Sequence, residues 1–195
     1  MMKLIIYLSI LIILFAGCRK SEEQTGESVP QEPKAIKEAK EALKKVEEAL
    51  SKEITESNFQ KGRSLSTIKL KSLKTDTIID LNQFKGKKIM IDFWSSWCLP
   101  CIEMFPDLNR LKKEYEDEKG ILKVITISVD PMPEKVLEVI KEKNALFEVL
   151  QAPELLQNAG ILLPFTVFVD ETGVVKETMN GKHSFEELKK FIGVE

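Results

Sequence analysis

The stretch Ile91–Cys101, IDFWSSWCLPC, sets two cysteines at the junction of an expected strand and an expected helix. Residues 87–94, KKIMIDFW, contain a nearly continuous apolar run, which is typical of a strand buried on both faces of a sheet. Residues 100–118, PCIEMFPDLNRLKKEYEDE, carry apolar residues at helical spacing. Pro106 should kink this helix, because proline lacks a backbone donor and clashes with the preceding turn.

This placement favours redox chemistry at the two cysteines. Cys98 would lie at a helix N-terminus, where free N–H groups and the positive end of the helix dipole stabilise a thiolate. Leu99 and Pro100 then hold Cys101 one turn further on, where it is less exposed. Cys98 could attack a substrate disulfide, and Cys101 could resolve the mixed disulfide. In the reverse direction, the oxidised pair would accept electrons from a substrate dithiol.

Other uses of a cysteine pair fit the sequence less well. A structural zinc site needs further cysteines or histidines, and the chain has three cysteines and one histidine, His183. A purely structural disulfide that closes so small a loop would remove little chain entropy. We therefore expect no metal and no cofactor beyond a redox-active Cys98–Cys101 disulfide.

The N-terminus has the features of a targeting segment. A short positive start, MMK, precedes the twelve-residue apolar run LIIYLSILIILF, which has the length of a signal-peptide core and is too short to span a bilayer. The following LFAGC resembles the bacterial lipobox, although Phe15 replaces the usual leucine. The resemblance implies a lipoprotein signal peptide over 1–17 and lipidation of Cys18. The alternative is a plain secretory signal with a cysteine nearby by chance.

Two segments separate this leader from the globular domain. Residues 18–33 are polar, with two prolines, and are expected to be a flexible tether. Residues 34–57 are expected to be a charged helical spacer, because apolar residues recur at steps of three and four and Glu41–Lys45 and Glu48–Lys52 are i,i+4 pairs. About two heptads favour a monomer over a coiled-coil dimer through 34–54.

Residues 58–195 are expected to form one α/β domain. Outside the cysteine region, the predicted elements are a hairpin (66–73 with 76–81), a strand (121–130), a helix (133–144), a short strand (147–151), a short helix ending at Gly160, a second hairpin (165–170 with 174–180), and a last helix opened by a Ser184–Glu187 capping box and ended by Gly193. Buried strands that alternate with helices predict a central sheet with a parallel core, covered on both faces.

Two motifs together resemble a known family. DFWSSWCLPC with FP following, and LLPFTVFVDETGVV at 162–175, are similar to the thioredoxin superfamily, most closely to its membrane-anchored TlpA/ResA-like thiol–disulfide oxidoreductases. The resemblance covers residues 59–195. It implies a mixed sheet flanked by helices, with an N-terminal β-hairpin and an α/β insert. It also implies that Cys98 is the nucleophile and Cys101 the resolving cysteine.

The resemblance extends to residues outside the cysteine pair. Pro106 matches the helix-kinking proline, and Pro164 matches the cis-proline that faces the cysteines. Leu163 would then offer backbone hydrogen bonds to a substrate chain, as in β-strand addition. Trp97 is expected to shield the active site and, with Leu163 and Pro164, to bind the substrate.

At Asp92 and Met104 the sequence is closer to classical thioredoxins than to the ResA-like branch. Asp92 matches the buried acid of thioredoxins, which moves protons to and from the resolving cysteine. Its apolar neighbours in the strand favour burial over an exposed position, and burial would raise the pKa of its carboxyl. The ResA-like branch instead has a glutamate three residues after the second cysteine, where this chain has Met104; Glu103 is one position away, on another helix face.

The expected function is disulfide exchange in a bacterial cell envelope, facing the periplasm or the exterior. Expected partners are protein disulfides or dithiols, such as those of apocytochromes c, a membrane thiol reductase as electron donor, and the membrane itself through Cys18. The formal net charge of −2 gives no support to nucleic-acid binding. The alternatives are a disulfide-forming oxidant of the same fold and a non-enzymatic binding module.

Overall fold

The computed structural model describes residues 34, 36–38, 41–42, 45 and 54–194. The described residues between 34 and 45 are helical, and the predicted Glu41–Lys45 ion pair is present at 3.6 Å. The expected signal peptide, tether and Glu48–Lys52 pair lie outside the described residues, as does Cys18. Among the helices that are described, none combines the length and the apolar character needed to cross a membrane.

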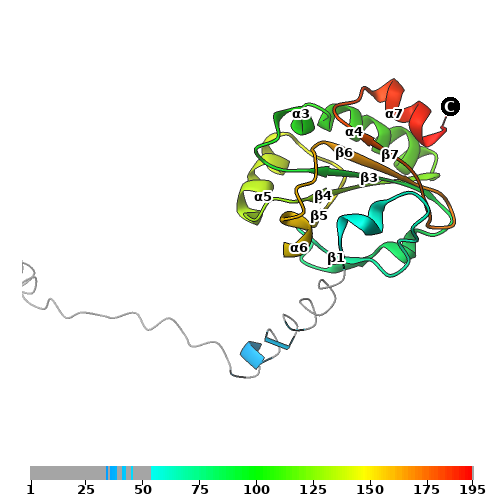
Figure 1. Ribbon diagram of the computed structural model, residues 1–195. Helices are drawn as coiled ribbons and strands as arrows, with labels where there is room; N and C mark the ends of the chain where they lie inside the picture. The colour runs from blue at the N-terminus through cyan, green and yellow to red at the C-terminus, as the bar shows by residue number, and fades with distance from the viewer. Residues whose placement is uncertain (1–33, 35, 39–40, 43–44, 46–53, 195) are drawn as a thin grey trace, which may run out of the picture. The chain divides into compact units, whose positions relative to one another are not determined.

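A seven-stranded mixed sheet forms the centre of the domain (Figure 1), as predicted. The strands lie in the order β2-β1-β5-β4-β3-β6-β7, and β5, β4 and β3 form the parallel core. The β1–β2 hairpin extends the sheet antiparallel to β5, and the β6–β7 hairpin extends it antiparallel to β3. The bounds are β1 Lys69–Ser72, β2 Ile78–Asp80, β3 Lys88–Trp94, β4 Leu122–Ser128, β5 Glu148–Gln151, β6 Phe165–Val169 and β7 Val175–Asn180.

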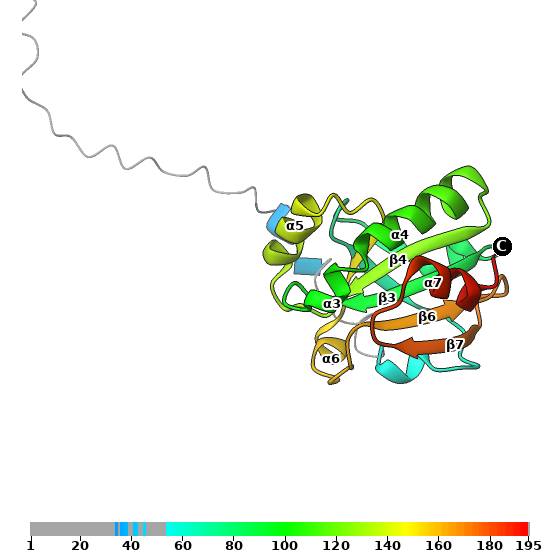
Figure 2. The same ribbon diagram turned by 90° about the horizontal axis from the view of Figure 1, so that it is seen from above.

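Helices cover both faces of the sheet. Side chains from α3 (Leu99–Ile102), α4 (Phe105–Leu111), α5 (Pro133–Glu142) and α7 (Phe185–Ile192) pack in one apolar cluster. Side chains from the 3-10 helices η1 (Glu56–Phe59) and η2 (Leu81–Phe84) and from α6 (Glu154–Gln157) pack in a second cluster, which includes Ile54. Figures 1 and 2 show α4 and α7 on one side of the sheet, with α3 near the end of β3.

Strand β3 contributes to both clusters because successive side chains point to opposite faces. Ile89, Ile91 and Phe93 lie in the cluster with η1 and α6, whereas Met90 and Trp94 lie in the cluster with α3 and α4. Asp92 has the parity of Met90 and Trp94. Its side chain therefore shares the face of the sheet that contains the cysteines.

The predicted helix break is present. Helix α3 ends at Ile102, two residues in turn conformation follow, and α4 starts at Phe105 with Pro106 in its first turn. The helix continues after Leu111 as a π-helix, η3 (Lys112–Glu118), which the sequence pattern did not predict. In η3, Glu116 accepts a hydrogen bond from the Val124 N–H at 2.9 Å and forms an ion pair with Lys123 at 2.6 Å.

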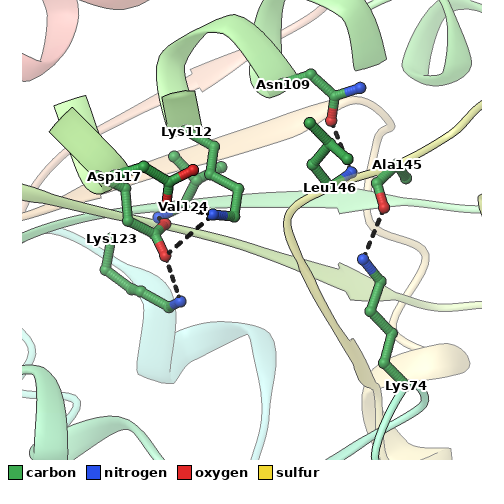
Figure 3. A network of polar contacts seen from close by, with 9 residues as sticks. Lys74, Asn109, Lys112, Asp117, Lys123, Val124, Ala145 and Leu146 are labelled. Carbon is green, nitrogen blue, oxygen red and sulfur yellow. Dashed lines mark hydrogen bonds and ion pairs between the residues drawn. The ribbon is translucent and has the colours of Figure 1, made fainter. Parts of the chain in front are cut away.

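Helix α4 is also fixed to the insert between α5 and β5 (Figure 3). Asn109 accepts a hydrogen bond from the Leu146 N–H at 2.8 Å and donates one to the Asn144 carbonyl at 2.9 Å. Lys74, beyond the end of β1, donates to the Ala145 carbonyl at 2.7 Å. The loop 144–146 is therefore held from two sides.

The predicted end of the last helix is confirmed, whereas the predicted end of the short helix is not. The Ser184–Glu187 capping box opens α7, and Gly193 follows it in the left-handed conformation at φ 60°. Helix α6, in contrast, ends at Gln157. Asn158 closes α6 with a side-chain hydrogen bond to the Glu154 carbonyl at 3.0 Å, so Gly160 belongs to the loop that follows.

Candidate active site

Cys98 and Cys101 form a disulfide at the start of α3, with their Cα atoms 5.3 Å apart. Cys98 is the N-cap residue of this helix, and its carbonyl accepts hydrogen bonds from the Cys101 and Ile102 N–H groups at 3.1 Å. Cys98 retains 5% of its surface, whereas Cys101 has none. The two sulfurs are therefore unequal, because only Cys98 offers any surface to a partner.

Two exposed apolar side chains flank Cys98 in the sequence, and a third, Leu162, precedes Leu163 and Pro164. Trp97 and Leu99 flank Cys98 and are 69% and 64% exposed, and Leu162 is 72% exposed. Large apolar side chains that stay in solvent around a reactive group favour contact with another molecule. Trp97 is not a core aromatic, so it is available for the expected contact with substrate.

The Leu163–Pro164 peptide bond is cis. Pro164 directly precedes β6, whose first residue Phe165 pairs with Phe93 near the end of β3. The cis bond therefore lies at the same end of the sheet as the segment that leads into the cysteines. The Pro164 carbonyl accepts a hydrogen bond from the Gly181 N–H at 2.8 Å, whereas no backbone hydrogen bond joins Leu163 to any other described residue. Leu163 thus has the free backbone that strand addition requires.

Asp92 is completely buried in the middle of β3. Thr166, its cross-strand neighbour on β6, donates a hydrogen bond to Oδ1 at 2.8 Å, and Oδ2 has no partner within the described part of the chain. Burial raises the pKa of this carboxyl to about 7, against the opposing effect of the Thr166 hydrogen bond. A carboxyl with such a pKa exchanges protons readily at neutral pH.

Neither Met104 nor Glu103 replaces this acid. Met104 is fully buried in the apolar cluster that includes both cysteines. Glu103 is exposed and forms an ion pair with Lys182 at 2.6 Å, at the surface. Asp92 is therefore a buried carboxyl on the face of the sheet that contains Cys101, a role that neither Met104 nor Glu103 fills.

Sequence reasoning missed Asp130, a fully buried carboxylate that follows β4. Its Oδ2 atom accepts hydrogen bonds from Ser95 Oγ at 3.0 Å, from the Ser96 N–H at 3.1 Å and from Ser96 Oγ. The stretch ITISVD could have pointed to Asp130. An acid at the carboxyl end of a buried parallel strand lies beside the end of the neighbouring strand, which here leads to the cysteines. No group of three or more metal-ligating side chains gathers among the residues that the structure describes.

Comparison with known proteins agrees with this geometry. The Redoxin family matches residues 60–192. The thiol-disulfide oxidoreductase ResA of Bacillus thuringiensis subsp. konkukian is 30% identical over 117 residues, which cover 58% of this chain and 66% of ResA. The thioredoxin-like protein YneN of Bacillus subtilis is 28% identical over 142 residues, which cover 69% of this chain and 80% of YneN. The chain thus spans 66% of the length of this ResA protein.

A solved structure extends the likeness to the fold. A thiol:disulfide interchange protein of the thioredoxin family from Chlorobium tepidum superposes with a TM-score of 0.59 at 20% identity, covering 69% of this chain and 96% of that one. The family match covers most of the domain, and the cysteine pair and the cis-proline lie where the family resemblance predicts them. The chain therefore belongs to the Redoxin family, within the thioredoxin superfamily, and is similar to its TlpA/ResA-like branch.

Proposed function

We propose that this chain is a thiol–disulfide oxidoreductase that reduces protein disulfides through Cys98 and Cys101. The observation that carries the proposal is the inequality of the two sulfurs at the start of α3: Cys98 is the N-cap residue and is partly accessible, and Cys101 is fully buried. Exchange through a mixed disulfide requires one cysteine that reaches the substrate and a second, resolving cysteine that does not.

In the reduced protein, the Cys98 thiolate attacks one sulfur of a substrate disulfide. A bond forms between Cys98 and the substrate, and the second substrate sulfur leaves as a thiolate. Cys101 then loses its proton to the Asp92 carboxylate and attacks Cys98 Sγ, which releases the remaining substrate thiolate. The cysteine pair gives up two electrons, and the two substrate thiolates become a dithiol by taking one proton from Asp92 and one from solvent. A membrane thiol reductase would return the electrons to the oxidised pair.

The substrate would bind along the cis-proline loop. The free backbone of Leu163 can pair with an extended substrate segment, while the exposed Trp97 and Leu162 contact its apolar side chains. We place this reaction on the outer side of a bacterial membrane, with lipid on Cys18 as the anchor and apocytochromes c as the substrates. The LFAGC sequence supports the anchor, and the likeness to ResA supports the class of reaction.

The activity is tested with the full chain carrying Cys18→Ser, purified in detergent, so that Cys98 and Cys101 are its only thiols. It should reduce insulin with dithiothreitol as the electron source. Cys98→Ser should abolish turnover, and Cys101→Ser should trap a mixed disulfide through Cys98. Full activity in the Cys98→Ser variant would contradict the proposal.

The direction of the reaction is tested by the reduction potential against glutathione. A value near that of thioredoxin, about −270 mV, supports a reductant, and a value near that of DsbA, about −120 mV, supports the alternative oxidant. The anchor is tested by incorporation of labelled palmitate into the native chain, which Cys18→Ser should prevent. For the substrate, deletion of the gene should reduce haem attachment to c-type cytochromes, and the native chain, but not Cys98→Ser, should restore it.

A further inference from the structure

Asp130 lies behind the segment that carries the nucleophile. It follows β4, which is paired in parallel with β3, so the end of β3 and the start of the cysteine loop lie beside it. Its Oδ2 atom accepts from Ser95 Oγ, from the Ser96 N–H and from Ser96 Oγ. Its Oδ1 atom accepts from the Met132 N–H at 2.9 Å. One carboxylate thus binds two adjacent residues of the cysteine loop.

The carboxylate is itself held in place. Its own N–H donates to Ser128 Oγ at 3.2 Å, and its carbonyl accepts from Gln151 Nε2 at 2.8 Å. Burial alone would raise the pKa of Asp130, but hydrogen bonds from Ser96, Met132 and Ser95 outweigh burial and hold that pKa below its usual range. The group is therefore a buried anion fixed to the ends of two strands, β4 and β5.

The loop bound by Asp130 leads directly to Cys98. The Cys98 N–H donates to the Ser95 carbonyl at 3.0 Å, which closes the turn from β3 into α3. The position of Ser95 therefore sets the position of the N-cap residue. Because the dipole effect of a helix falls off within its first turn, a small displacement of Cys98 changes how strongly the helix stabilises its thiolate.

We infer that Asp130 is a positioning residue that holds the Ser95–Ser96 segment so that Cys98 stays at the N-terminus of α3. This inference rests on the proposed thiol–disulfide activity. Within the described residues no hydrogen bond joins Asp130 to either cysteine, so it acts through the turn between Ser95 and Cys98. Through Asp130, the ends of strands β4 and β5 support the segment Ser95–Cys98.

The test compares the pH profile of alkylation of Cys98 by iodoacetamide in reduced protein, with Cys18→Ser in every chain. Ser95→Ala removes one hydrogen bond and leaves the Asp130 charge in place, so it should shift the midpoint upward by about half a pH unit. Asp130→Ala should shift the midpoint in the same direction. If Asp130 acted only through its negative charge, its removal would favour the thiolate and shift the midpoint downward.

Asp170 provides the matched control. Its Oδ1 atom accepts from the Thr172 N–H, Thr172 Oγ1 and the Val174 N–H, a set much like that of Asp130, but in the turn between β6 and β7. Asp170→Ala should leave the midpoint and the reduction potential unchanged. The inference is overturned if the midpoint of Asp130→Ala moves downward or does not move, or if Asp170→Ala shows the same upward shift. If Asp130→Ala does not fold, the midpoint of Ser95→Ala tests the inference instead, and the absence of an upward shift overturns it. Failure of the proposed function would appear separately, as absent insulin reduction by the Cys18→Ser chain.

Discussion

Replacing Asp92 with asparagine should make the folded protein more stable at alkaline pH. Asparagine keeps the shape of the carboxyl and an oxygen to accept the Thr166 hydrogen bond, but it cannot ionise. In the native chain, burial raises the pKa of Asp92 from 3.8 to about 7. The folded state therefore holds its proton over a pH range in which the unfolded state has already lost it.

The sign and size of the effect follow from this difference. Between pH 4 and pH 7 the folded state binds more protons than the unfolded state, so stability falls as pH rises, and it levels off above the folded pKa. A shift of about three pH units at about 1.4 kcal/mol each corresponds to roughly 4 kcal/mol. Asp92→Asn lacks this loss, so its advantage over the native chain should grow from near zero at pH 4 to roughly 4 kcal/mol at pH 8.

The assay is urea unfolding of the two oxidised chains, followed by tryptophan fluorescence between pH 4 and pH 8. Carboxyls whose pKa is lowered in the folded state, such as Asp130, make stability rise with pH. This contribution is the same in both chains, so it cancels when the two unfolding free energies are subtracted. Parallel stability curves for the two chains would refute the reasoning. A second readout separates stability from chemistry: Asp92→Asn should slow the attack of Cys101 on a mixed disulfide at neutral pH, and unchanged kinetics would place the carboxyl out of reach of Cys101.

Three further substitutions test packing, capping and the surface near the site. Phe105→Ala should lower the free energy of unfolding by about 3–5 kcal/mol, measured by urea unfolding, because the ring contacts Trp94 and Phe147 at centroid distances of 4.8 and 5.0 Å. Ser184→Ala should cost about 1 kcal/mol in the same assay, because it removes the N-cap of α7; no change would mean that the cap is not needed. Glu103→Gln should leave insulin reduction intact, because this carboxylate pairs with Lys182 in solvent; a loss of activity would give Glu103 a role in proton transfer.

Local patterns in the sequence predicted much of the domain. The order of elements, the break at Pro106 and the capping box at Ser184 all appear where the sequence placed them. Each depends on interactions within a few residues of the chain, such as a missing backbone donor or a side chain that reaches the next helical turn. The π-helix after Leu111 was not predicted, because the buried residues Leu108, Leu111 and Tyr115 keep the steps of three and four that are typical of an α-helix.

The candidate site was predicted only in part, because a pattern along the chain does not show which distant residues meet. The motif identified both cysteines, and the family resemblance pointed to Asp92 and Pro164. The unequal burial of Cys98 and Cys101 depends on how α3 packs against β3. Asp130 lies 35 residues from Ser95 and 34 residues from Ser96, and it reaches them only because β4 pairs with β3.

The sequence by itself determined the chemistry available to this protein: a cysteine pair at the start of a helix, few further cysteines or histidines that could complete a zinc site, and an acid within an apolar strand. The tertiary structure decided how that chemistry is arranged. A residue of β3 can point to either face of the sheet. Helices α3 and α4 pack on the face to which Asp92 points, so its carboxyl lies on the same side of the sheet as Cys101. Sheet pairing brings Pro164 and Asp130 to the end of β3, because contacts between strands form across space and leave no local mark in the chain.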